Sequence, residues 1–199
     1  MERDDLSRRS LLQALAATIG AAALPSSWAQ LAPIAHATEP AGEPKISFLS
    51  AAEAADIEAV AAQIIPTDDT PGARDAGVVY FIDRALATFL SQLATDYRAD
   101  LAQFQAGFRE RHPRGGSFAA LTSAQQIDYL REVDHTPFFE TTRLLTLLGM
   151  FSLAAYGGNR NGIGWKLLGF EDQHVFEPPF GYYDRDYAGF VPYTKEKAS

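Results

Sequence analysis

A long apolar run that leads into a glycine-rich stretch limits the fold of this chain more than any other feature. The run spans residues 137–156 and is apolar nearly all round after Arg143. Pro137 suits the first position of a helix, because no intrahelical bond needs its missing N–H. We therefore expect a central helix that starts at Thr136 and Pro137, ends near Tyr156 and is buried on several sides. Its large apolar residues are Phe138, Phe139, Leu144, Leu145, Leu147, Leu148, Met150, Phe151 and Leu153.

The stretch that follows, residues 156–170, contains five glycines in fifteen residues. Each glycine inside a helix costs about 1 kcal/mol relative to alanine, so ordinary helix is not expected here. Gly157 or Gly158 can end the preceding helix in the left-handed conformation, and residues 159–164 then form a tight polar turn. A dinucleotide-binding loop is disfavoured, because Leu167 stands where the third glycine belongs. A structural turn, or a rigid loop that docks on a partner, fits better.

Four amphipathic segments precede the central helix. Ser50 and Glu53 form a capping box that starts the first, and Pro66 ends it. The fourth begins at Thr122 or Ser123 and is expected to bury Ile127, Leu130 and Val133. The four segments span about residues 50–65, 75–90, 93–108 and 122–133. The pattern predicts an all-α protein, a compact bundle of about five helices with long ordered loops.

The loop over residues 66–77 contains two prolines, two glycines and three aspartates. Its carboxylates, Asp68, Asp69 and Asp75, suggest a cation site at first sight. A calcium loop needs ligands at alternate positions and a distal glutamate, and this run has neither. We therefore expect the carboxylates to cap the first turn of the next helix and complement its dipole.

The N-terminus has the form of a twin-arginine export signal. Arg8 and Arg9 precede a leucine pair, and an apolar run of fourteen residues follows from Leu11 to Leu24. A helix that spans a membrane needs about 20 residues, so this run is too short for one. Residues 1–37 are therefore expected to be the signal and its linker, and the route is one that carries folded proteins.

Two further regions follow from these boundaries. Residues 46–175 form the predicted helical domain. Residues 176–193 hold seven aromatic side chains among prolines and glycines, with neither helical nor strand spacing. Residues 176–199 are therefore predicted to be an irregular aromatic-rich tail. A disordered segment is poor in aromatics, so we expect this tail to dock, either on its own domain or on another subunit.

Composition and motifs assign no chemistry to the chain. Its formal charge of −8 argues against nucleic-acid binding. It has no cysteine, and its four histidines include no pair at metal-ligand spacing. No Gly-x-Ser-x-Gly motif occurs, so a serine nucleophile is not indicated. We therefore assign no catalytic, cofactor-binding or metal-binding residue.

Two segments resemble the gluconate 2-dehydrogenase subunit 3 family. They are residues 64–83 (IIPTDDTPGARDAGVVYFID) and residues 156–170 (YGGNRNGIGWKLLGF), and the resemblance extends over about residues 48–170. The resemblance implies that the chain is the non-catalytic small subunit of a periplasmic dehydrogenase for sugars, sugar acids or polyols. FAD would belong to a large catalytic subunit of GMC type, and haem c to a multihaem cytochrome subunit. The small subunit would carry the export signal to the Tat translocase and assist folding, and would meet the membrane only through the complex.

Anchors for such a partner can be suggested from residue type, because interface energy concentrates in tryptophan, tyrosine and arginine. The candidates are Arg160, Trp165, Tyr182 and Tyr183. Two other hypotheses stay open, a free-standing periplasmic binding or scaffold protein and an enzyme in its own right. The enzyme would need a cluster of polar groups that the sequence does not suggest.

Overall fold

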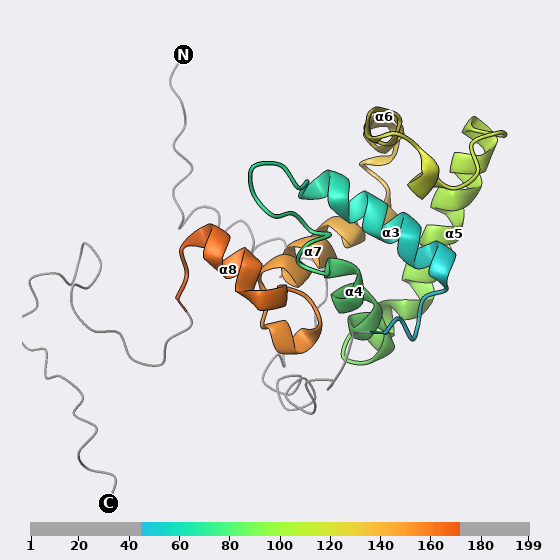
Figure 1. Ribbon diagram of the computed structural model, residues 1–199. Coiled ribbons are helices and arrows are strands. Elements are labelled where there is room, and N and C mark those ends of the chain that lie inside the picture. The colour runs from blue at the N-terminus through green and yellow to red at the C-terminus, as the bar shows by residue number, and fades with distance from the viewer. Residues whose placement is uncertain (1–44, 172–199) are drawn as a thin grey trace, which may run out of the picture.

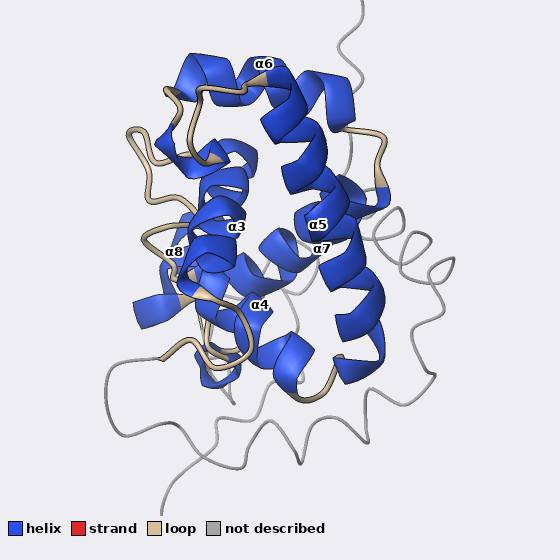
Figure 2. Ribbon diagram, turned by 90° about the vertical axis from the view of Figure 1, so that its right-hand side faces the viewer, coloured by secondary structure: helices blue, strands red, loops and turns tan. Residues whose placement is uncertain are grey.

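The computed structural model describes residues 45–171 of the chain. This part contains six α-helices and no strand (Figure 2). The predicted all-α class is confirmed. The helices are α3 (Ala51–Ile64), α4 (Val78–Ala87), α5 (Ala94–Arg111), α6 (Ser123–Val133), α7 (Pro137–Phe151) and α8 (Ile163–Leu168). Short 3-10 turns lie between some of them.

Helix α7 is the centre of the bundle. It packs against α3, α4 and α5, and α8 packs against it near its C-terminus. Thr136 caps its first turn by accepting a hydrogen bond from the Phe139 N–H at 3.4 Å, and Pro137 occupies the first helical position. Figure 1 shows α8 at one edge of the molecule, on the side opposite α5. The prediction of a central helix is confirmed.

An aromatic cluster fills the core between α5, α6 and α7. The Phe104 ring lies 4.5 Å from Phe138 and 5.3 Å from Tyr129, measured between ring centroids. Tyr97 is buried and shares a hydrogen bond of 3.0 Å with Thr142 on α7. Such edge and offset contacts add stability beyond the area they bury. Six large side chains of the second predicted segment, residues 75–90, are all buried: Val78, Phe81, Ile82, Leu86, Phe89 and Leu90.

A buried carboxylate on α4 holds the start of the domain in place. Asp83 is 1% exposed, and its oxygens accept four hydrogen bonds. The donors are the N–H groups of Ser47, Phe48 and Leu49 and the Ser47 hydroxyl, at 2.8–3.0 Å. A buried charge is costly unless hydrogen bonds satisfy it, and this set does so. The capping box at Ser50 and Glu53 is also present, as predicted.

Three boundaries differ from those expected. The central helix ends at Phe151 rather than near Tyr156, because Ser152 turns to an extended ψ of 178°. The second helix is shorter than residues 75–90, because Gly77 adopts the left-handed conformation at its N-terminus. The tight turn expected over residues 159–164 is a 3-10 turn that leads into α8, a helix that sequence analysis did not predict. The high glycine content of this stretch argues against a helix, and α8 has only six residues.

Two expected side-chain roles are also wrong. Ile127 was expected to be buried, but it is 37% exposed on α6. The aspartates of the 66–77 loop do not cap α4, whose N-terminus has no side-chain cap. Asp75 instead accepts hydrogen bonds from the Thr67 hydroxyl and the Gly72 N–H, at 2.5 and 2.9 Å, within its own loop. These bonds hold the pKa of Asp75 below its usual value.

Candidate partner-binding site

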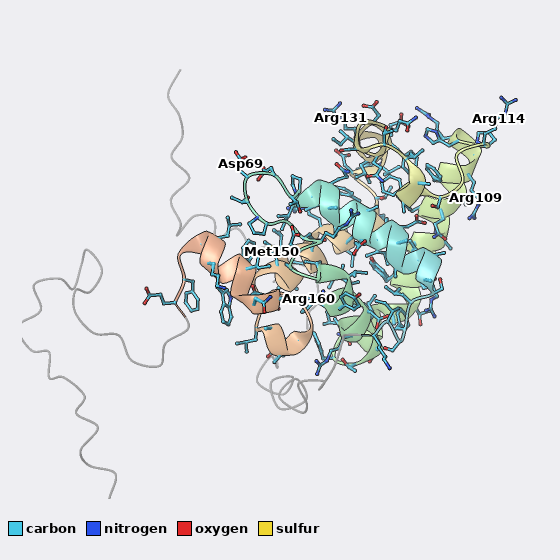
Figure 3. The ribbon with its side chains drawn as sticks, viewed as in Figure 1. Asp69, Arg109, Arg114, Arg131, Met150 and Arg160 are labelled. Atoms are coloured by element: carbon cyan, nitrogen blue, oxygen red, sulfur yellow. The ribbon has the colours of Figure 1, made fainter. Side chains whose placement is uncertain are left out.

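The two segments singled out in the sequence come together in space. The Arg160 N–H donates to the Ala76 carbonyl at 3.1 Å, and the Arg160 guanidinium lies over the Tyr80 ring, 4.5 Å from its centroid (Figure 3). Gly77 leaves room for this side chain, since a Cβ there would lie 2.5 Å from Arg160 Nε. Arg84 adds a link by donating to the Ala155 carbonyl at 2.6 Å. Residues 153–170, which we call the glycine-rich end, are thus fixed against α4.

Two glycines let the glycine-rich end touch the backbone of α7. A Cβ at Gly158 would lie 2.1 Å from the Gly149 carbonyl oxygen. A Cβ at Gly164 would lie 1.9 Å from the Met150 carbonyl oxygen. Real Cβ atoms do not approach backbone atoms this closely, and neither carbonyl can move without disturbing α7. The close approach therefore requires glycine at both positions.

Asn159 joins the end of α7 to the start of α8. It is fully buried and has a positive φ of 45°, which asparagine tolerates better than most residues. Its side-chain N–H donates to the Ser152 carbonyl, and its side-chain oxygen accepts from the Gly164 N–H, both at 2.8 Å. Sequence analysis placed Asn159 in a polar turn and missed this role. Its position after two glycines was the available signal.

Helix α8 ends in a motif that fixes the orientation of two rings. The Phe170 N–H donates to the Trp165 carbonyl at 2.8 Å, and the Gly169 N–H donates to the Lys166 carbonyl at 3.1 Å. With Gly169 in the left-handed conformation, these bonds form a Schellman motif. The Phe170 and Trp165 rings meet edge to face, 5.4 Å apart. The Trp165 ring N–H also donates to the Phe151 carbonyl at 2.8 Å, which ties α8 to α7.

Most of the exposed large apolar side chains between residues 45 and 171 lie at the glycine-rich end. Leu168 is 60% exposed, Phe170 52% and Leu167 40%, and these three form what we call the α8 patch. Leu153 precedes them, and Ile127 is exposed elsewhere, on α6. Exposed apolar side chains that gather in one place are typical of interaction sites.

The structure places only part of the predicted interface. Arg160 and Trp165 lie at the glycine-rich end, and both make contacts with α4 or α7 of their own chain. Tyr182 and Tyr183 lie outside the described residues, as do Arg8 and Arg9 of the export signal. The structure therefore places two of the four candidate anchors at the glycine-rich end, and gives each a role in holding that end in place.

A second surface feature lies where α3, α6 and α7 meet. It is an open groove of about 320 Å³ with a mainly apolar lining that includes Ile127. Arg131, Asp134 and Arg143 stand among its lining residues. In the part of the chain that the structure describes, no three His, Cys, Asp or Glu side chains gather closely enough to hold a metal ion.

Of the helices between residues 45 and 171, none combines the length and the apolar character that crossing a lipid bilayer requires. A family model described as gluconate 2-dehydrogenase subunit 3 matches residues 51–172. This match covers both of the segments that meet at the glycine-rich end. No curated protein and no solved structure gives a significant match.

Proposed function

Because the chain belongs to the gluconate 2-dehydrogenase subunit 3 family, whose members are small subunits of a dehydrogenase complex, we propose that it is the non-catalytic small subunit of a periplasmic, flavin-dependent dehydrogenase. Its partner is a large catalytic subunit of GMC type that oxidises a sugar, sugar acid or polyol. The observation that carries this proposal is the family match over residues 51–172, which includes both of the segments that pack together around Arg160.

The redox chemistry belongs to the other subunits. The chain has no cysteine, so it cannot form the thioether bonds that attach a c-type haem. FAD is held by the catalytic subunit, and haem c by a cytochrome subunit that passes electrons toward the respiratory chain. This chain contributes binding surface, and it contacts the membrane through the complex alone.

Export is the second part of the role. Arg8 and Arg9 form the signal that the Tat translocase reads, and this route carries folded proteins. A catalytic subunit that lacks its own signal can cross only while bound to this chain. The small subunit therefore acts before catalysis, by assisting folding and by supplying the export signal.

The test replaces Arg8 and Arg9 by lysine in the full chain, expressed with its catalytic subunit. Lysine keeps the charge but lacks the planar guanidinium fork. Periplasmic dehydrogenase activity should fall to background, while flavin-containing catalytic subunit accumulates in the cytoplasm. Replacing Arg109 and Arg114 by lysine is the matched control, since both are exposed on the far side from α8 (Figure 3). Normal periplasmic activity in the Arg8→Lys, Arg9→Lys variant would overturn the shared-signal proposal.

A further inference from the structure

The α8 patch is a preorganised surface. Leu167, Leu168 and Phe170 point outward from a helix that is fixed at both ends, by Asn159 at its start and by the Schellman motif at its end. A six-residue helix is not stable by itself. Its position depends on Gly164, which packs against the backbone of α7. Surfaces fixed in this way lose little freedom on binding, which favours affinity.

We propose that the α8 patch is the surface that docks into an apolar groove of the flavin-dependent catalytic subunit. This inference rests on the proposed function and adds the place of contact. Arg160 and Trp165, suggested as anchors from the sequence, act here as positioning residues. They hold the glycine-rich end against α4 and α7, and Leu167, Leu168 and Phe170 make the contact. An apolar helix face laid in a groove is a recurring mode of recognition.

Composition supports a protein partner of this kind. Lys166 is the one charged residue in residues 161–170, in a chain with a formal charge of −8. Buried centres of interfaces are depleted in charged residues and enriched in aromatic ones. The α8 patch therefore has the composition of an interface centre rather than of an ordinary solvated surface.

The position of the patch argues against the tail as its occupant. The family match ends at residue 172, so it includes the patch but leaves out the tail at residues 176–199. A segment shared with the family is therefore not built to bind a tail that the match leaves out. A second copy of the chain as the occupant is an outcome of the test below.

The test compares two substitutions at sites of nearly equal exposure. Leu167 is 40% exposed in the patch, and Ile127 is 37% exposed on α6. Full-length variants Leu167→Asp and Ile127→Asp are each expressed with the catalytic subunit, and the affinity of the purified pair is measured. Leu167→Asp should weaken binding by at least about tenfold, while Ile127→Asp should leave it unchanged. Leu168→Asp should act like Leu167→Asp.

Further measurements distinguish the docking proposal from the alternatives. Thermal melting of each isolated chain should show no greater loss for Leu167→Asp than for Ile127→Asp. A greater loss, or equal affinities of the two variants, would overturn the docking assignment. So would a self-associated chain that Leu167→Asp dissociates, or an effect that disappears when residues 176–199 are deleted. If the wild-type chain itself fails to bind a flavin-dependent subunit, the proposed function fails instead.

Discussion

The helical core and the glycine-rich end are held together by different means. In the core, α3 to α7 are packed through large side chains such as Phe104 and Phe138, whose rings interlock. At the glycine-rich end, backbone meets backbone at Gly158 and Gly164, and Asn159 supplies the connecting hydrogen bonds. The core buries its apolar side chains, whereas the glycine-rich end leaves those of the α8 patch exposed to solvent. A region built on backbone contacts can keep its side chains free for a partner.

The largest effect on stability is expected in the core. Phe138 is 1% exposed and contacts both Tyr97 and Phe104, so Phe138→Ala leaves a cavity that its neighbours cannot fill. Truncation of a buried phenylalanine costs about 3–5 kcal/mol. Denaturant unfolding followed by circular dichroism measures the loss. Leu168→Ala, at an exposed position, should change the free energy of unfolding by less than about 0.5 kcal/mol. Equal losses for the two variants would contradict the comparison of the two regions.

A single methyl group should damage the glycine-rich end. Gly164→Ala places a Cβ against the Met150 carbonyl oxygen, and overpacking of this kind costs about 1–3 kcal/mol or more. Gly162→Ala meets nothing within 4 Å but has a φ of 65°, so it carries backbone strain alone, about 1 kcal/mol. Denaturant unfolding of both variants separates clash from strain. A loss for Gly162→Ala as large as that for Gly164→Ala would mean that the close approach to α7 does not matter.

The hydrogen bonds of Asn159 should matter locally. Asn159→Gly keeps the positive φ accessible but leaves the Ser152 carbonyl and the Gly164 N–H without their partner. This loss should lower the free energy of unfolding by about 2 kcal/mol. Amide hydrogen exchange should speed up in α8 and stay unchanged in α5. Asn161→Gly is the matched control, since Asn161 also has a positive φ but is exposed. Slow exchange of α8 in the Asn159→Gly variant would show that α7 packing alone holds it.

The smallest effect is a response to acid in the 66–77 loop. Hydrogen bonds from Thr67 and Gly72 lower the pKa of Asp75 from its usual 3.8. A lowered pKa in the folded state means that the stabilisation is present above pH 3.8 and is lost as pH falls through the lower, folded value. The Gly72 amide shift, followed by NMR, should titrate below pH 3.8 and stop doing so in Asp75→Asn. The same titration in Asp69→Asn should be unchanged. A Gly72 midpoint above pH 3.8 would contradict the bonding seen here.

At alkaline pH, the change in stability comes from the core. Burial raises the pKa of Tyr97 well above its usual value of 10. Because the unfolded chain releases this proton first, the contribution of Tyr97 is complete below pH 10 and falls as pH rises above it. The 66–77 loop and the core thus respond to opposite ends of the pH scale.

Sequence analysis predicted what depends on local pattern. Helical spacing indicated the segments that form α4 and α5, and the helix starts at Ser50 and Thr136 are confirmed. It missed α8, because glycine content argues against helix and six residues are too few to show a period. It also missed the burial of Asn159, since a polar residue between glycines is ordinarily assigned to the surface.

The sequence by itself determined the helical class, the central place of α7 and the two segments that mark the family. Only the tertiary structure decided that these segments meet, with Arg160 over Tyr80, and that Leu167, Leu168 and Phe170 stay exposed. The reason is physical. Helix spacing and capping act within a few residues, whereas a contact between residues 80 and 160 exists only after α4 and α7 have packed and brought distant backbone together.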